Sequence, residues 1–509
     1  MKQYVAILLA FGSMLAGCAA HFQDVPLAQG HVNEERRIHS VDRPDQPVIL
    51  VAISGGGSRA AALGWAVLEK LKRTSYTVGG QTMRLIDDIA VVSSVSGGSV
   101  IAGYFGLNGP DGLDGFDRAF LRPDNMRALE LHALNPFTWV RLKSTGNSRI
   151  KLLQELLDRE IYAGKTFDAL NQPGKPLVVL NSTDMASGEV FSFLPSRFDD
   201  ICADFDAEPL STGVSASAAF PILLTPVALR NYGGADCNSG PMPPWITAVL
   251  DKQFTRYVNL EEFNRARYAY DLRRGPGASR QIDYLYLLDG GLADNLGVNA
   301  LMDVIDSAHG AAIISGSKGG IETILNAVNV GDITRLAVVV VNARTEPPNP
   351  VSVKASRPGI IGMIDSTTSV PIDSSTSRGM DQVDTLLSEL QAAPQGDAAG
   401  LRVYKIQVDF DLFRAQNATE KALSDAVKKI PTSFSISGDQ VGVLERSAEV
   451  LLNDSPCFQR LLLDAGVVES DGMAQYAVKG CPQLADRPAI RPASTDGAVA
   501  PARAAATAR

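Results

Sequence analysis

A serine in a tight turn is the first residue of this chain whose setting could do chemistry. Ser96 stands in Ser-Val-Ser-Gly-Gly at 94–98, after the apolar run 89–92 and before the stretch 100–105. A strand, a sharp turn with serine at its apex and a helix form a nucleophile elbow, which lifts a hydroxyl out of the backbone. A helix that begins at Gly97 would place unpaired N–H groups beside a developing oxyanion. The pattern indicates acyl transfer through a serine, and its alternative is a Ser-Gly turn without chemistry.

Glycines and a carboxylate follow two other apolar runs. The run 49–53 leads into three glycines at 55–57 and then into a helical stretch. Successive glycines let backbone N–H groups converge on one point, which makes a nest suited to negative charge. The run 284–288 ends in Asp289. Because ligand sites in open α/β sheets form at the carboxyl ends of strands, we expect all three turns to open onto the same edge.

Taken together, these segments resemble the patatin-like phospholipase family. Its motifs are a loop G-G-G-x-R/K, a serine in G-x-S-x-G and an aspartate in D-G-G/A, which match 55–59, 94–98 and 289–291 here. Ser94 departs from the family, because it stands where the serine motif has its first glycine. The resemblance is strong over 48–302 and fades toward residue 455. Weaker family-like stretches lie between the motifs, at 135–137, 181–184 and 216–221.

The resemblance implies an α/β fold of the patatin-like three-layer type, with a mainly parallel central sheet and helices on both faces. The residues point to the same class. From residue 48 onward, short apolar runs alternate with helical periods, which is typical of a parallel sheet covered on both faces. Further strands are expected at 177–180, 336–341 and 403–408, and late helices at 380–390 and 441–452.

The activity implied by the resemblance is that of a serine lipid acyl hydrolase, like a phospholipase A or a lysophospholipase, without a cofactor or metal. Ser96 would be the nucleophile and Asp289 would accept its proton directly. A free carboxylate is a weak base for a serine hydroxyl, so the site must raise the pKa of Asp289, and apolar neighbours favour this. The oxyanion hole would use the backbone N–H groups of Gly55, Gly56, Gly57 and Gly97.

Several polar residues near the motifs keep more than one interpretation. Arg59 would steady a substrate phosphate, hold the oxyanion loop, or serve as an ordinary structural or solvated arginine. Asp184 and Asp294 would cap turns or helices, or else shape the pocket. The segment Pro-Phe-Thr-Trp-Val at 136–140 would face a membrane or gate the substrate, or pack in the core.

Two other catalytic or binding patterns compete with the serine–aspartate pair. Ser96, Asp289 and His309 follow the chain order of an α/β-hydrolase triad. However, His309 precedes a glycine at the expected end of a helix, on the far side of the sheet from the strand carboxyl ends. Three of the five histidines lie before residue 40, and His132 reads as a surface or packing residue. Residues 55–60 also fit a dinucleotide fingerprint, but the acidic residue expected about 20 positions later is missing.

A non-catalytic function is the competing class. A surface lipoprotein with the patatin fold could act as a scaffold or binding module. Such a protein would have no use for Ser96, Asp289 and three adjacent glycines together, so the sequence favours the enzyme.

The N-terminus has the pattern of an export signal. A positive start, the apolar run 4–16 and small residues before a cysteine make a secretory signal peptide, too short for a retained membrane span. Leu-Ala-Gly-Cys at 15–18 is the lipobox of bacterial lipoproteins, which implies cleavage before Cys18 and its acylation; an ordinary signal peptide is the alternative. Ala19 rather than aspartate follows, which indicates sorting to the outer membrane, on its periplasmic or surface face.

The charge of the chain limits its partners. The formal net charge is −9, and no basic run is long enough to indicate nucleic-acid binding. An acidic protein is not held at an anionic membrane by its own charge, so the N-terminal acyl chains would anchor it. The expected partners are therefore a lipid or phospholipid ester and a membrane reached through the anchor.

Four cysteines remain after Cys18. They permit three pairings, and an exported chain matures where disulfides form. Sequence proximity favours Cys202–Cys237 and Cys457–Cys481. No metal site is expected, because four aspartates over 199–206 lack the spacing of a calcium loop and read as a solvated acidic segment.

The expected organisation is one large catalytic domain with appended ends. Its parts are a signal peptide (1–17), a polar tether (18–47), the patatin-like catalytic domain (48–302), a continuation of the same α/β domain (303–455), a disulfide-linked segment (456–484) and a disordered tail (485–509).

Overall fold

The fold is described from a computed structural model. Of the 509 residues it describes 22, 24–29, 31–33, 46–134, 149–221, 223–233, 241–251, 260–274, 280–301, 334–345, 360–392, 402–414, 417–467 and 470–483. The signal peptide, Cys18, Cys237, His309, the segment 136–140 and the tail 485–509 lie outside these residues, and so does the side chain of His132.

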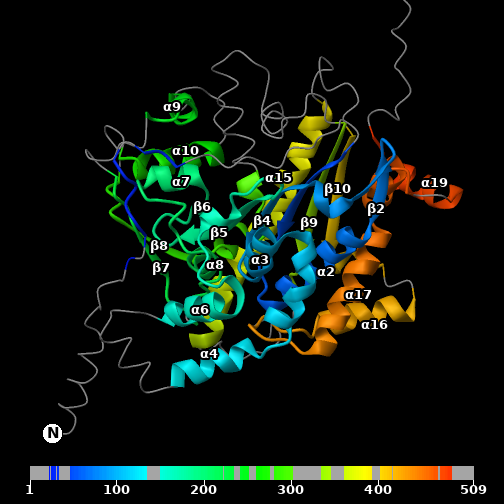
Figure 1. Cartoon of the computed structure of the whole chain (residues 1–509), viewed down its shortest axis with the longest axis horizontal. Coiled ribbons are helices and arrows are strands. Elements are labelled where there is room, and N and C mark those ends of the chain that lie inside the picture. The colour runs from blue at the N-terminus through cyan, green and yellow to red at the C-terminus, as the bar shows by residue number, and fades with distance from the viewer. Residues whose placement is uncertain are drawn as a thin grey trace, which may run out of the picture.

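A mixed sheet forms the centre of the described molecule (Figure 1). Its strand order is β10-β9-β1-β4-β5-β8-β7, and β6 also pairs with β5. The five strands from β10 to β5 are mutually parallel, whereas β6, β7 and β8 pair in antiparallel fashion. The strands are β1 (Val48–Ile53), β4 (Ile89–Val95), β5 (Leu177–Asp184), β6 (Val190–Phe193), β7 (Val227–Arg230), β8 (Tyr284–Asp289), β9 (Arg335–Asn342) and β10 (Arg402–Asp409), with a separate hairpin of β2 (Ser75–Val78) and β3 (Gln81–Arg84).

Helices connect and cover these strands. The described α-helices are α2 (Ser58–Arg73), α3 (Gly97–Gly112), α4 (Asn125–Leu134), α6 (Arg149–Leu157), α7 (Pro195–Asp200), α8 (Leu210–Ser217), α9 (Pro244–Asp251), α10 (Leu260–Leu272), α11 (Gly291–Asp294), α15 (Ile360–Ala392), α16 (Ala418–Val427), α17 (Gly438–Asp454), α18 (Pro456–Asp464) and α19 (Asp471–Gly480).

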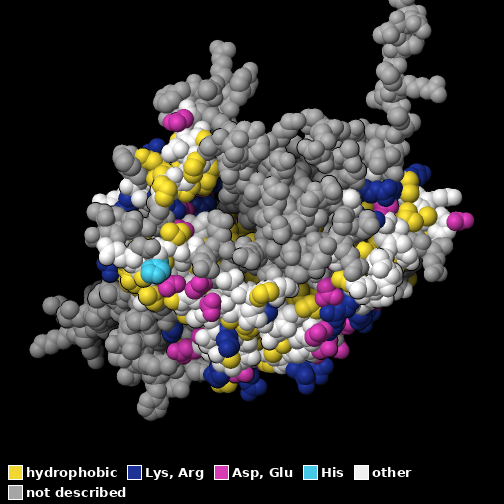
Figure 2. All heavy atoms as spheres, turned by 45° about the horizontal axis from the view of Figure 1, so that its top comes forward, with side chains coloured by type: hydrophobic (Ala, Val, Ile, Leu, Met, Phe, Trp, Pro, Cys, Tyr) yellow, Lys and Arg dark blue, Asp and Glu magenta, His cyan; other side chains and the backbone are white. Residues whose placement is uncertain are grey.

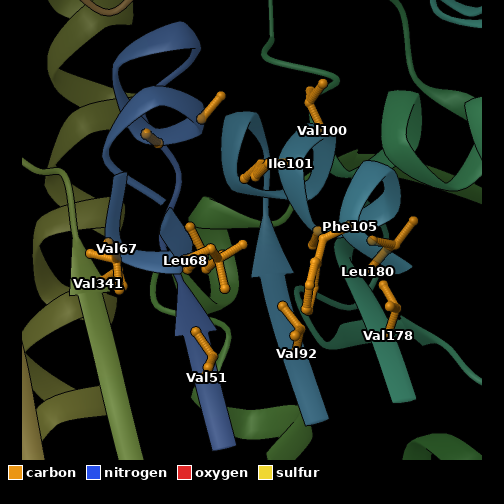
Figure 3. Close-up of a cluster of buried hydrophobic side chains, with 14 of the residues drawn as sticks. Val51, Val67, Leu68, Val92, Val100, Ile101, Phe105, Val178, Leu180 and Val341 are labelled. Atoms are coloured by element: carbon orange, nitrogen blue, oxygen red, sulfur yellow. The ribbon is translucent and has the colours of Figure 1, made fainter. Parts of the chain in front are cut away.

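The sheet separates two apolar cores. Alternate side chains of a strand point to opposite faces, so a strand buried on both faces is apolar at almost every position. On one face, strand residues meet α2 and α3, as Figure 3 shows for Val51, Val67, Leu68, Val92, Val100, Ile101, Phe105, Val178, Leu180 and Val341. On the other face, Val48, Leu50 and Val338 pack with Val383 and Leu387 of α15. The expected α/β fold with a mostly parallel sheet and helices on both faces is confirmed.

The part of the chain after residue 302 completes this sheet. β9 pairs with β1 in parallel, and β10 pairs with β9. α17 packs on α2, where Lys70 lies 3.7 Å from Glu449 and Arg73 lies 3.8 Å from Glu445. Figure 2 shows basic and acidic side chains interspersed among the described residues of the face in view.

One expected disulfide is present. Cys457 at the start of α18 bonds Cys481 at the end of α19, with their Cα atoms 4.9 Å apart. Cys202 is also disulfide-bonded, to a partner outside the described residues.

The segment expected to be a tether is in part a docked piece of the domain. Pro26 forms a β-bridge with Ala203, and the Asp24 carboxylate accepts the N–H of Arg230 at 2.9 Å. The side chain of Asn33 donates to Asp199 at 2.8 Å. These polar side chains satisfy hydrogen-bonding groups of the domain, so the segment is held without the apolar periodicity that sequence analysis looks for.

The acidic segment 199–206 is likewise built into the structure. Besides the Asn33–Asp199 bond, the buried Asp200 carboxylate pairs with Arg197 at 3.1 Å and with Arg273 at 2.5 Å. The expectation of a solvated loop is wrong for these two residues, because cationic and amide partners from distant segments compensate their burial. Among the described residues, no group of three or more His, Cys, Asp or Glu is arranged to hold a metal ion. None of the described helices is both long and apolar enough to cross a bilayer.

Candidate active site

Ser96 lies at the junction of β4 and α3. Its backbone has φ 51° and ψ −121°, a conformation that non-glycine residues seldom adopt. β4 ends at Val95 and α3 begins at Gly97, so Ser96 is the apex of a strand–turn–helix arrangement. Its side chain is largely buried, with 9% of the residue exposed. The turn therefore has the geometry of a nucleophile elbow.

The glycine loop touches this turn through its backbone. A Cβ placed on Gly97 would lie 1.9 Å from the carbonyl oxygen of Gly57, and one on Gly98 would lie 2.6 Å from that of Ile53. Gly57 itself has φ 62° and would bring a Cβ to 2.4 Å from the carbonyl oxygen of Ser433. A side chain at Gly97 would push the Ser96 turn away from the glycine loop, so glycine is required there for their contact.

Asp289 meets the Ser96 turn from an unexpected direction. It is the last residue of β8, which runs antiparallel to β5. The expectation that the carboxyl ends of parallel strands meet at one edge therefore does not explain its position. β5 extends beyond its partner β4, and β8 pairs with that extension, with Asp289 opposite Ser182. Since Asn181 lies opposite Val95, Asp289 finishes level with the end of β4. The expected meeting of the two turns is thus correct, but the expected strand direction is wrong.

The Asp289 carboxylate is buried beside the serine. It interacts with the Ser96 side chain, and its Oδ1 accepts the N–H of Gly291 at 2.9 Å. Burial raises the pKa of Asp289 to about 6, although these two contacts oppose the rise. A carboxyl with a raised pKa was expected at this position, and the exclusion of water from Asp289 accounts for the rise.

The four predicted oxyanion glycines are not equivalent. The N–H of Gly55 donates to the carbonyl of Asn295 at 3.0 Å, so this amide already has an acceptor. Asn295 is in turn fixed to α15, since its Nδ2 donates to Thr376 at 3.0 Å and its N–H to Ser375 at 3.2 Å. Gly55 thus holds the loop in place, which leaves the amides of Gly56, Gly57 and Gly97 as the candidates for binding an oxyanion.

Arg59 is held by the part of the chain after residue 302. Its Nε donates to the carbonyl of Ala343 at 2.8 Å, one terminal nitrogen to that of Ile430 at 2.6 Å, and the other to the hydroxyl of Thr432 at 3.0 Å. The residue is almost fully buried, and this burial lowers the pKa of its guanidinium to about 10. Of the three interpretations, these contacts favour the one in which Arg59 holds the loop.

Both secondary carboxylates make turn contacts. Asp184 accepts from the N–H of Ala186 at 3.1 Å and from the Ser187 hydroxyl at 2.7 Å. Asp294 accepts the N–H groups of Leu296, Gly297 and Asn299 at 2.6–3.2 Å. Their contacts agree with the capping interpretation.

The residues that support the Ser96 and Asp289 turns were not identified from the sequence. Asn181, Ser217 and Asn295 lie outside the three motifs, and each hydrogen-bonds to one of the turns or to the loop. Asn181 and Ser217 belong to the weaker family-like stretches, which was the available signal. Nothing in the sequence near Asn295 indicated a contact with Gly55, because that contact spans 240 residues of separation between 55 and 295.

A substitution separates the interpretations of Arg59. We expect Arg59→Lys to lower the free energy of unfolding by about 1–3 kcal/mol, because one ammonium cannot satisfy the three buried acceptors. Chemical denaturation measures this loss, and Arg122→Lys, at an exposed ion pair with Asp117, is the control with little effect. Unchanged stability with a raised KM for phospholipid but not for a neutral ester would instead indicate phosphate binding.

The central part of the chain matches a known family. Residues 51–302 match the family described as Patatin, patatin-like phospholipase. No curated protein matches the chain.

Similar solved structures have low identity to this chain. Human GIVD cytosolic phospholipase A2 is 13% identical, with 84% of this chain and 62% of that chain covered and a TM-score of 0.38. The same human protein in complex with methyl gamma-linolenyl fluorophosphonate is 11% identical, covers 84% and 61%, and has a TM-score of 0.40. VipD from Legionella pneumophila is 11% identical, covers 89% and 78%, and has a TM-score of 0.25.

The chain thus spans about three fifths of the length of the human structures. The family match covers all three motifs, from the glycine loop to the Asp289 turn. Residues 51–302 of this chain are a patatin-like phospholipase domain.

Proposed function

We propose that this protein is a serine lipid acyl hydrolase in which Ser96 is the nucleophile and Asp289 is its base. The observation that carries the proposal is the position of the Ser96 side chain beside a buried carboxylate whose pKa is raised to about 6. A base with a pKa near the working pH combines the correct protonation state with useful basicity. The strained backbone of Ser96 supports the same assignment, because such strain gathers at functional sites.

The reaction would proceed through an acyl-enzyme. Ser96 Oγ attacks the ester carbonyl carbon while its proton passes to Asp289, which gives a tetrahedral intermediate. Collapse of the intermediate breaks the ester C–O bond, and the proton on Asp289 goes to the departing alcohol. Water then attacks the acyl-serine carbonyl while Asp289 takes its proton. Collapse of this second intermediate breaks the bond to Ser96 Oγ, which regains the proton from Asp289 as the fatty acid leaves.

The amides of Gly56, Gly57 and Gly97 are the proposed oxyanion donors. They lie where the glycine loop and the start of α3 are in backbone contact, and the start of a helix adds its positive dipole end. One such donor is commonly worth about 3–4 kcal/mol of barrier. No protein cation is assigned to the oxyanion, because the guanidinium of Arg59 is engaged by three acceptors.

The nucleophile and base are tested with a fluorophosphonate probe and a fatty acyl ester. We expect Ser96→Ala to abolish labelling and hydrolysis, and Asp289→Asn to be nearly as damaging, because an amide cannot take the proton. His309→Ala should retain most activity. Labelling of Ser96→Ala, or loss of turnover in His309→Ala at unchanged stability, would contradict the dyad. A wild-type chain that is neither labelled nor active would favour the scaffold function.

The pKa of Asp289 predicts the pH profile. The base must be ionised, so kcat/KM is expected to be constant above pH 7 and to fall about tenfold per pH unit well below pH 6. Asp294 also has a pKa raised to about 6 by burial, so Asp294→Asn is the control that separates the two carboxyls. A midpoint near pH 4, or one that disappears in Asp294→Asn, would contradict the assignment to Asp289.

We further propose that the protein is exported and anchored through acylated Cys18, at the outer membrane. The supporting observations are the lipobox and the Cys457–Cys481 disulfide, which fits an oxidising compartment. The acyl chains would hold the enzyme near its lipid substrate, on the periplasmic or the surface side.

Fractionation tests the anchor. We expect membrane association that detergent releases and high salt does not, because salt screens charge but does not extract acyl chains. Cys18→Ser should lose the lipid while it keeps its hydrolase activity. The intact mass of the mature protein is decisive, since a chain that begins elsewhere or at an unmodified Cys18 would exclude the anchor.

A further inference from the structure

A row of buried hydroxyls lies against the Ser96 turn. It consists of Ser94, Ser99 and Ser217, which are hydrogen-bonded in that order. We propose that Ser217 is a positioning residue that fixes the turn of Ser96 relative to the turn of Asp289. This inference rests on the proposed roles of those two residues.

Ser217, the last residue of α8, bonds to both turns. Its Oγ accepts the N–H of Ser96 at 2.8 Å, and its main-chain carbonyl accepts the N–H of Gly290 at 3.1 Å. One residue therefore holds the amide of the nucleophile and the amide next to the base. Because Ser217 is fully buried, water does not replace either bond.

The hydrogen bonds around Ser217 fix the direction of its hydroxyl. Its single proton is donated to the carbonyl of Asn181 at 2.5 Å. The Ser99 hydroxyl, 2.9 Å away, must then be the donor to Ser217. With one bond donated and two accepted, Ser217 Oγ uses its proton and both lone pairs. A lone pair therefore stays directed at the N–H of Ser96.

Ser94 extends this row and gives its departure from the family motif a structural role. Its Oγ lies 3.1 Å from that of Ser99 and 3.3 Å from the carbonyl oxygen of Val179. Because the proton of Ser99 points to Ser217, the single proton of Ser94 is available either to Ser99 or to the carbonyl of Val179. A glycine at this position, as in G-x-S-x-G, would remove both contacts.

The backbone of Ser96 needs such support. Its φ of 51° is a strained conformation that persists only where the surroundings over-determine it. Loss of the Ser217 hydroxyl would leave the N–H of Ser96 and the carbonyl of Asn181 without the bonds they make to it, inside the protein. The turn could then relax and move Ser96 Oγ away from Asp289. Misplacement of reacting groups by about 1 Å is enough to cost roughly a hundredfold in rate.

The test compares Ser217→Ala with Ser215→Ala. Ser215 lies on the same helix and is equally buried, but its hydroxyl has no hydrogen-bond partner among the described residues. Both variants thus remove one buried hydroxyl, and only one removes the contact with Ser96. The readouts are kcat and KM for p-nitrophenyl butyrate and the second-order rate constant for a fluorophosphonate, each expressed per labelled site so that loss of folded protein does not count.

We expect Ser217→Ala to lower kcat and the labelling rate constant together by roughly tenfold to a hundredfold, with KM unchanged. Ser215→Ala should stay within about twofold of the wild type, in line with a buried hydroxyl that contacts neither turn. Equal rate constants in the two variants, or an effect of Ser217→Ala on KM alone, would overturn the positioning role.

A second variant keeps the test decisive if Ser217→Ala does not fold. Ser99→Ala removes the donor to Ser217 together with the Ser94–Ser99 contact, but it keeps the bond from Ser96 to Ser217. We expect its kcat to fall several-fold below that of Ser215→Ala; equal values overturn the proposal. The wild type separates this inference from the proposed function. Labelling at a residue other than Ser96 refutes the nucleophile itself. If Ser96 is labelled but the substitutions of Ser217 and Ser99 leave kcat unchanged, only the positioning role is refuted.

Discussion

The contact of three backbone turns at one level of the sheet is the constraint on which the site depends. A Cβ on Gly97 would collide with the glycine loop at the carbonyl of Gly57, and one on Gly290 would collide with the carbonyl of Asn181, the residue opposite the end of β4. Close contact excludes water, and the resulting burial raises the pKa of Asp289. The same packing that assembles the groups thus also sets their acid–base chemistry.

Close packing of turns requires that each turn be held from outside. The Ser96 turn is held by Asn181 and Ser217, and the glycine loop by Asn295 and Arg59. The partners of Arg59 are main-chain carbonyls and a hydroxyl from 343–432, beyond the residues that match the family. The later part of the chain therefore completes the site as well as the sheet.

Burial has a different consequence for each of three buried ionisable groups. Asp289 is left with a serine hydroxyl and one amide, so its pKa rises into the range useful for a base. Arg59 has three acceptors and remains a structural cation, whereas Asp200 is paired with two arginines. The partner of a buried charge, more than its burial, decides whether the group can do chemistry or only hold the fold.

Local signals in the sequence were enough to predict the elements and the groups of the candidate site, because the strand, turn and helix patterns around Ser96, the three glycines and Asp289 involve neighbouring residues. The sequence could not determine the direction of β8, because that strand pairs with the part of β5 that extends beyond the end of β4. Nor could it show that 24–33 dock, or that Arg59 and Ser217 serve distant turns. Those contacts join residues far apart in the chain, and only the tertiary structure brings their hydrogen-bonding groups together.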